Sequence, residues 1–134
     1  MNESISVPEI PNIVNAPLSL GVKNGRLVSV CGMAPISPDG VLVGIGDVEV
    51  QAEQVLKNMA LILQKAGGKM SDVIKTTVFL ANIEDYDKMN KVYARHFSKE
   101  CYPARAAIGV KMGDPRLLIE IEALAVLPED PASA

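Results

Sequence analysis

The sequence contains no tryptophan, one histidine and two cysteines, and these scarcities exclude several kinds of site. Aromatic residues make up 4% of the chain, which argues against a surface that stacks the bases of single-stranded nucleic acid. His96 cannot complete a metal cluster with Cys31 and Cys101, which form no Cys-x-x-Cys pair, so we expect no metal. Both cysteines are typical of reduced thiols in a cytoplasmic protein.

Long apolar runs and clusters of one charge are also missing. No apolar segment approaches the ~20 residues of a membrane-spanning helix, and residues 1–11 lack the basic and apolar regions of a signal peptide. The 13 basic residues are scattered through a chain of net charge −3, so no basic stripe can neutralise phosphates. We therefore expect a cytoplasmic protein that binds neither nucleic acid nor a membrane, although one arginine would suffice for a small anion.

The 134 residues, 49% of them hydrophobic, suffice for one domain with its own core. We predict a single domain over 1–134, with a loose N-terminal arm over 1–12 and a frayed tail over 128–134. Between these ends, the chain has no linker and no low-complexity tract.

The order of predicted elements is that of an α+β fold. Asn24-Gly25 predicts a type I′ hairpin turn. Apolar residues three and four positions apart predict helices over 48–66, ended by Gly67 as a C-terminal cap, and over 86–99. Alternating or β-branched residues predict strands over 27–31, 41–43, 73–80, 104–110 and 117–127. Two helices would then pack on one face of a mixed sheet.

The last strand predicts that the chain forms an oligomer. Ile119, Ile121, Ala123 and Ala125 share one face, and Glu120, Glu122, Leu124 and Val126 share the other. Similarly, Ile74, Val78 and Leu80 of strand 73–80 are expected on one face. Two helices cover only one face of the sheet, so we expect the aliphatic residues of the other face to pack on further copies.

Three charged residues are candidates for chemistry or binding. Arg105 enters a strand of small apolar residues, either as a surface ion pair or as a bidentate clamp for a carboxylate. Glu120 and Glu122 share a face, where they form salt bridges, lie at an edge, or hold a water in a cleft. His96 has no partner in the sequence, and we expect it on a helix surface.

Four motifs in this order resemble the RidA/YjgF family of enamine/imine deaminases, also called the endoribonuclease L-PSP family. They are Val-Ile-Lys-Thr-Thr-Val-Phe over 73–79, the helix segment 86–93 with Met89-Asn90, Pro103-Ala104-Arg105, and Ile-Glu-Ile-Glu-Ala over 119–123. The resemblance extends from about residue 15 to 127. It implies a chorismate-mutase-like fold and a homotrimer with a central β-barrel and sites between subunits.

The resemblance also implies roles for individual residues. Arg105 would hold the substrate carboxylate, and Glu120 would position the attacking water. The other positions that correspond to substrate-binding residues are Leu18, Cys31, Gly32, Asn90 and Ala107.

The chain departs from the family pattern at several of these positions. Typical members have Pro-Tyr-Ser where this chain has Pro17-Leu18-Ser19, so an aromatic hydroxyl is absent. Cys31 replaces a serine, Ala107 replaces a cysteine, and Met112-Gly113 stands where Leu-Pro is usual. These changes make the expected pocket less polar and put its standard substrate in question.

The expected reaction is hydrolysis of a small 2-enamino or 2-imino acid, such as 2-aminoacrylate, to a 2-oxo acid and ammonia, without a cofactor. One alternative is a pathway deaminase of a larger unsaturated amino acid such as 2-aminomuconate. Another is a non-catalytic trimer that binds small molecules. Ribonuclease activity is the reading least favoured by the acidic charge and the single histidine.

Overall fold

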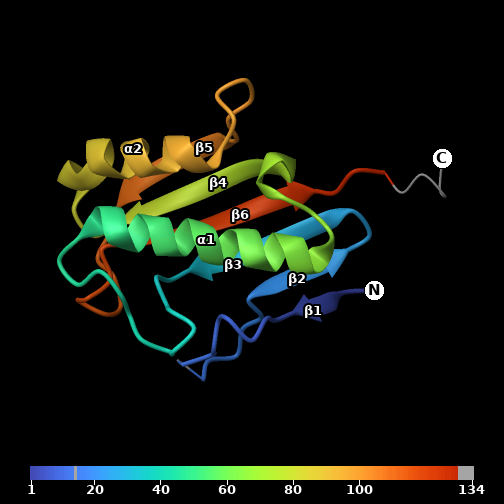
Figure 1. Cartoon of the computed structure of the whole chain (residues 1–134). Coiled ribbons are helices and arrows are strands. Elements are labelled where there is room, and N and C mark those ends of the chain that lie inside the picture. Colours follow the sequence, from blue (N-terminus) through green and yellow to red (C-terminus); the bar gives the residue numbers. More distant parts are fainter. Residues whose placement is uncertain (14, 130–134) are drawn as a thin grey trace.

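The computed structural model describes residues 1–13 and 15–129, which form one six-stranded mixed sheet with two helices packed on it (Figure 1). The strands are β1 (Glu3–Ile5), β2 (Gly21–Asn24), β3 (Leu27–Met33), β4 (Val73–Leu80), β5 (Ala104–Gly109) and β6 (Ile119–Val126). The helices are α1 (Val48–Ala66) and α2 (Tyr86–His96), with short 3-10 turns at Met70–Asp72 and Ile83–Asp85. The predicted α+β class is confirmed.

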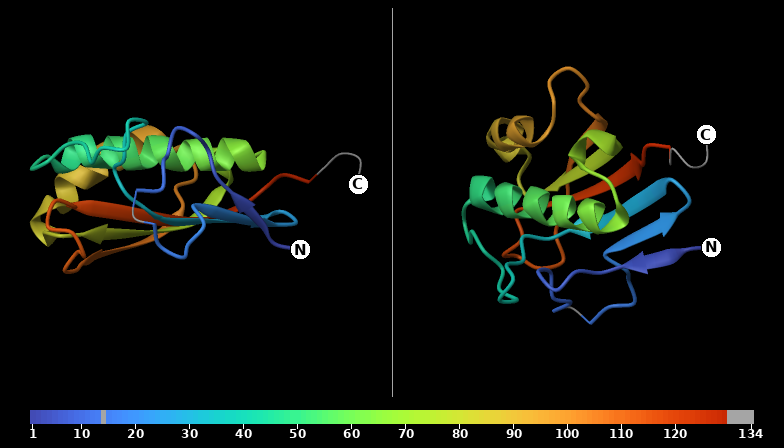
Figure 2. Two further views of the ribbon diagram at one scale, coloured as in Figure 1. Left: turned by 90° about the horizontal axis from the view of Figure 1, so that it is seen from below. Right: turned by 45° about the vertical axis from the view of Figure 1, so that its right-hand side comes forward.

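The sheet has the order β1-β2-β3-β6-β4-β5, so the C-terminal strand β6 lies at its centre. Only β4 and β5 pair in parallel, and α2 connects them. Both helices lie on one face of the sheet and leave the other without a helical cover (Figure 2). The helix-covered face of β6 is formed by Ile119, Ile121, Ala123 and Ala125, all buried, which confirms the predicted alternation.

Helix α1 has the predicted bounds because both of its ends are capped. The carboxylate of Asp47 accepts hydrogen bonds from the backbone N–H groups of Glu49 and Val50. Gly67 ends the helix with a φ of 95°, the left-handed conformation that glycine adopts without strain.

Helix α2 ends at His96, three residues earlier than predicted. Nε2 of His96 lies 2.7 Å from Oε2 of Glu53 on α1, and its side chain is only 17% exposed. His96 therefore links the two helices, and the expectation of a simple helix-surface residue is wrong. The hydrogen bond with His96 lowers the pKa of the Glu53 carboxyl.

The N-terminal segment corrects the prediction of a loose arm over residues 1–12. Strand β1 pairs antiparallel with β2, and the side chains of Ile5, Val7 and Ile10 are buried. These apolar residues are too widely spaced to indicate a strand, but the free edge of β2 supplies hydrogen-bond partners that the sequence does not display.

Three smaller predictions are also corrected. The hairpin turn is centred on Gly25-Arg26, and only Gly25 has positive φ, so the predicted type I′ turn is wrong. Segment 41–43 forms only an isolated bridge between Ile36 and Leu42. A register shift between Val73 and Lys75 leaves Ile74 50% exposed, whereas Val78 and Leu80 are buried as expected.

Within the described residues, neither helix is long and apolar enough to cross a membrane. Of the predicted frayed tail, residues 130–134 lie outside the described part of the chain.

Candidate functional site

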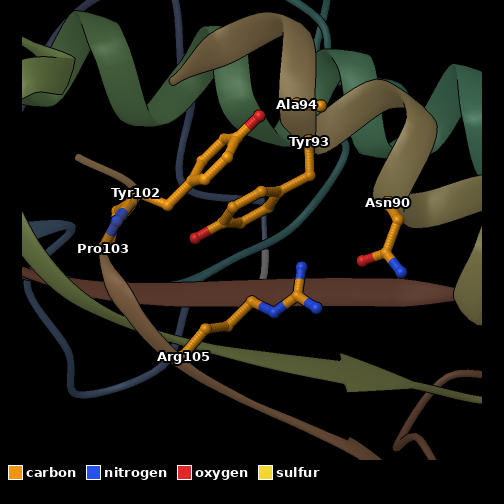
Figure 3. A pocket seen from close by; sticks show the side chains of 6 residues that line it. All are labelled: Asn90, Tyr93, Ala94, Tyr102, Pro103 and Arg105. Carbon is orange, nitrogen blue, oxygen red and sulfur yellow. The ribbon is translucent and has the colours of Figure 1, made fainter. Parts of the chain in front are cut away.

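Arg105 lies in a pocket of about 450 Å³ between the edge strand β5 and helix α2 (Figure 3). Strand β5 carries its side chain toward the helices, and α2 supplies Asn90 and Tyr93 from consecutive turns. Tyr102, shortly before Arg105 in the chain, also lines the pocket.

The guanidinium of Arg105 is held by aromatic and sulfur groups. Nη2 donates a hydrogen bond to Oη of Tyr86 at 3.0 Å, and Nη1 lies 3.8 Å from Sδ of Met89. The guanidinium carbon is 4.9 Å from the ring centre of Tyr93 and 5.4 Å from that of Tyr86, distances typical of cation–π contacts.

No carboxylate forms an ion pair with Arg105 among the residues that the structure describes. The interpretation as a surface ion pair therefore finds no partner among the described residues. A planar cation that is oriented by neutral groups keeps its full charge for a ligand, and its geometry suits a carboxylate.

Asn90 adds a second polar group to the same pocket. Its Oδ1 is buried and accepts no hydrogen bond from the residues that the structure describes, and Figure 3 shows its amide on the Arg105 side of the pocket. Because an unpaired buried carbonyl is costly, this atom is a candidate acceptor for a donor group of a ligand. Tyr93 is fixed beside it by a 2.7 Å hydrogen bond between its hydroxyl and that of Thr76.

Glu120 lies in a second hollow, of about 330 Å³, together with Leu18, Cys31 and Gly32. Oε2 of Glu120 is 2.8 Å from where a Cβ on residue 32 would stand, so the absence of a side chain at Gly32 makes room for the carboxyl. Burial raises the pKa of Glu120 above the ordinary 4.5, because a half-buried carboxylate loses hydration.

Cys31 is a neutral thiol rather than a nucleophilic thiolate. Burial, followed by the charge of Glu120, raises the pKa of its thiol to about 11. At neutral pH its sulfur can therefore contact a ligand only as a small, weakly polar group.

The structure distinguishes Glu120 from Glu122. Both point to the helix-free face, since they lie two residues apart on β6. However, Glu122 is exposed and lines a different hollow with Ser29, Lys75 and Thr77. Only Glu120 adjoins Cys31 and Gly32.

Arg105 and Glu120 point to opposite faces of the sheet. Arg105 pairs with Thr76 and Glu120 with Phe79, and residues that pair across strands share a face. Thr76 and Phe79 are three positions apart on β4, so their side chains point to opposite faces. Ala107 pairs with Val78 and lies on the helix-covered face with Arg105. One chain thus carries two separate groups of candidate site residues, one on each face of the sheet, which are called half-sites below.

The half-sites divide the residues predicted from the sequence. The Arg105 half-site contains Arg105 and Asn90, with Ala107 on the same face of β5. The Glu120 half-site contains Leu18, Cys31, Gly32 and Glu120. Tyr86, Tyr93 and Tyr102 were not predicted as site residues. The sequence does show an aromatic face on the 86–97 helix and a tyrosine beside Pro103. However, a helix face that packs in the core has the same pattern, so it did not indicate a site.

In the described ranges, no group of three or more His, Cys, Asp and Glu side chains is arranged to hold a metal ion.

The sheet, its two helices and an arginine without a carboxylate partner in the described chain define an α+β protein with a candidate anion site. The family model described as "Endoribonuclease L-PSP" matches residues 11–127. The chain belongs to this family, which is the RidA/YjgF family that the sequence motifs resemble.

Relatives of known name cover nearly the whole chain. A RutC family protein of Pyrococcus horikoshii is 41% identical over 93% of this chain and 98% of its own. A human protein named 2-iminobutanoate/2-iminopropanoate deaminase is 38% identical over 91% of this chain and 88% of its own. The crystal structure of E. coli TdcF with bound serine has a TM-score of 0.83 and 31% identity, covering 94% of this chain and 99% of its own.

Proposed function

We propose that this protein hydrolyses 2-enamino and 2-imino acids to 2-oxo acids and ammonia. The carrying observation is Arg105, whose guanidinium is oriented by Tyr86 and Tyr93 and is left without a carboxylate partner in the described residues. Support also comes from relatives named as imine deaminases and from a related structure that holds serine, a small molecule with a carboxylate.

The reaction starts when Arg105 binds the substrate carboxylate through two parallel hydrogen bonds. Protonation of the enamine carbon of 2-aminoacrylate produces 2-iminopropanoate. Water held by the ionised Glu120 attacks the C=N carbon, the C–N bond breaks, and pyruvate and ammonia are released. Because these imines also hydrolyse without a catalyst, the protein contributes mainly orientation and electrostatic stabilisation.

Both half-sites can act on one substrate only if a second copy of the chain brings its Glu120 half-site to the Arg105 half-site of the first. The helix-free face offers the contact surface, because it carries Leu27 at 52% and Ile108 at 44% exposure. A closed ring of three copies, as the family resemblance implies, would form three such composite sites.

Mixing two inactive variants tests this arrangement. Arg105→Ala and Glu120→Gln subunits should each form inactive oligomers. Unfolded together and refolded at equal amounts, they should regain about a quarter of the wild-type sites, because each composite site draws its two halves from different copies. The measurement is pyruvate release from freshly generated 2-aminoacrylate, corrected for the spontaneous rate.

The control is an equal mixture of Arg105→Ala subunits with subunits that carry both Arg105→Ala and Glu120→Gln. It should stay inactive, because no copy in it has Arg105. Absence of recovered activity in the complementary mixture, with mixed oligomers demonstrated by mass spectrometry, would contradict a site shared between copies.

The pH profile tests the role of Glu120. If its ionised form holds the water, kcat/KM should fall as pH decreases, with a midpoint above the ordinary carboxyl value of 4.5, because burial raises its pKa. Any residual activity of Glu120→Gln should lack this acidic limb. A carboxyl with a raised pKa in the folded state destabilises the fold above its unfolded pKa, so the variant should be at least as stable at pH 7. A wild-type midpoint at or below 4.5 would argue against this role.

A non-catalytic binder is the competing function, since an oriented Arg105 would also hold a carboxylate without turnover. Binding of pyruvate without any rate above the spontaneous hydrolysis would favour it.

A further inference from the structure

The hollow beside Glu120 is larger than the side chain of a small imine requires. Its volume of about 330 Å³ lies at the lower end of the range for small-molecule sites. A water molecule in the liquid occupies about 30 Å³, and a methyl group is of similar size. The hollow is therefore far larger than the methyl side chain of the alanine imine.

The lining of this hollow is mainly aliphatic. Its wall includes Leu18, Leu20, Met33, Ile36, Leu42 and Leu117. Met33, Ile36 and Leu117 are buried and belong to the fixed framework of the fold, whereas Leu18 is 49% exposed at the opening. The absence of a tyrosine at position 18 leaves this wall without an aromatic hydroxyl.

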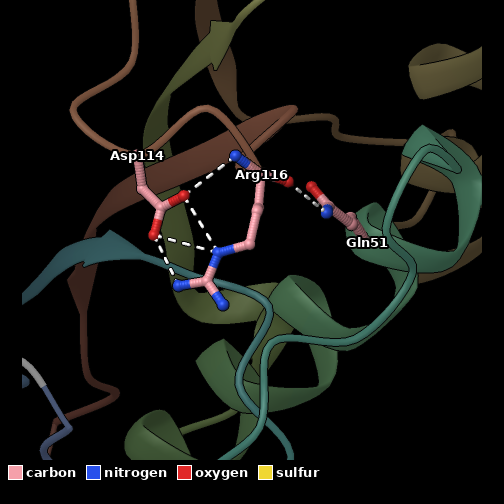
Figure 4. Close-up of polar contacts among 3 residues, drawn as sticks. All are labelled: Gln51, Asp114 and Arg116. Atoms are coloured by element: carbon pink, nitrogen blue, oxygen red, sulfur yellow. Dashed lines mark hydrogen bonds and ion pairs between the residues drawn. The ribbon is translucent and has the colours of Figure 1, made fainter.

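The one cation that lines the hollow in the described chain is Arg116, and it is already neutralised. Its Nη2 donates to Oδ2 of Asp114 at 2.7 Å and its Nε to Oδ1 at 3.1 Å (Figure 4). Hydrogen bonds from Arg116 lower the pKa of the Asp114 carboxyl to about 2, so the pair is ionised and has no net charge at neutral pH. Ionised Glu120 adds a negative charge to the same hollow.

We propose that this hollow binds the substrate's side chain and selects branched aliphatic 2-imino acids, such as the imine of leucine, over small or dicarboxylic ones. This inference rests on the proposed function. A substrate whose C=N carbon lies near Glu120 and whose carboxylate is held by Arg105 of another copy can extend its side chain along the aliphatic wall. A second carboxylate there would find no free arginine and would be repelled by Glu120.

The expected selectivity follows from apolar burial. One methylene in a fitted apolar pocket changes kcat/KM by roughly 10-fold or more, so the leucine imine should exceed the alanine imine by at least about tenfold. The glutamate imine, with its second carboxylate, should be the poorest of the three.

The experiment compares turnover with binding. An amino-acid oxidase generates the imines of leucine, alanine and glutamate in the presence of the full-length protein, and the rate of imine loss is measured. Calorimetry with 4-methyl-2-oxopentanoate, pyruvate and 2-oxoglutarate reports binding independently of turnover. The branched 2-oxo acid should bind at least about tenfold more tightly than pyruvate, since it buries more apolar surface.

A matched pair of variants tests the wall itself. Leu42→Gln places an amide in the hollow and should lower the leucine-to-alanine ratio of kcat/KM about tenfold, because an amide without a partner is costly there. Val41→Gln is the control, because Val41 is 56% exposed and does not line the hollow, so the ratio should stay at the wild-type value.

The possible results separate the two proposals. Equal rates and affinities for the branched and small compounds, or a preference for the dicarboxylate, would overturn the selectivity while the deaminase function stands. Tight binding of the branched 2-oxo acid without turnover would overturn the function and support the pocket. The absence of both binding and turnover would overturn both proposals.

Discussion

Replacing Arg105 by alanine should lower kcat/KM for 2-aminoacrylate by about 10²–10⁴-fold. The two hydrogen bonds of a bidentate guanidinium–carboxylate pair are each worth about 1.5–3 kcal/mol, and every 1.4 kcal/mol corresponds to a factor of about ten. Arg105→Lys should retain the charge but lose the planar fork, and we expect it to recover only part of the activity. The measurement is pyruvate release above the spontaneous rate at several substrate concentrations.

Arg95→Ala is the matched control for this prediction. Arg95 also lies on α2, but it is exposed and lines a groove next to Glu53 and Lys57 instead of the Arg105 pocket. Its loss removes the same charge from the protein, so a long-range effect of net charge would lower the rate in both variants. Wild-type activity of folded Arg105→Ala would refute the carboxylate clamp.

Replacing Gln51 by leucine should destabilise the fold by about 1–3 kcal/mol, because two partly buried backbone groups would lose their hydrogen-bond partners. The Gln51 side chain is fully buried on α1. Its Nε2 donates to the carbonyl oxygen of Arg116 at 2.9 Å, and its Oε1 accepts from the N–H of Leu118 at 2.8 Å. Figure 4 shows this amide against the loop that carries Asp114 and Arg116.

Urea unfolding at fixed protein concentration measures this effect. Gln64→Leu is the control, since Gln64 is an exposed glutamine on the same helix, and it should change the stability by no more than about 0.5 kcal/mol. Because the Gln51 hydrogen bonds hold the loop that leads into β6, Gln51→Leu should also displace Glu120 and lower activity. An unchanged unfolding midpoint would show that water or a backbone shift satisfies both groups.

Local sequence patterns predicted the helices and strands correctly where residues within or next to the element stabilise it. Helix α1 has the predicted bounds because Asp47 and Gly67 cap it and its apolar stripe is long. The two faces of β6 were also correct, because strict alternation leaves one way to bury its isoleucines. Four motifs in their order along the chain, those at 73–79, 86–93, 103–105 and 119–123, were together sufficient to identify the family.

Long-range pairing decided what the sequence alone did not. Ile5, Val7 and Ile10 are buried because the edge of β2 is free to pair, and a shift between Val73 and Lys75 exposes Ile74. A single-residue change of register moves a side chain to the other face, so no local pattern determines which charged residues meet.

The candidate site shows the same division. The sequence by itself determined the α+β class and the bounds of α1, and it singled out Arg105 and Glu120 as candidates for binding a carboxylate and positioning a water. Only the tertiary structure decided that Arg105 stands among three tyrosines, and that Glu120 lies on the opposite face beside an aliphatic hollow. The physical reason is that the face of each strand residue depends on its partner strands, which lie far away in the chain.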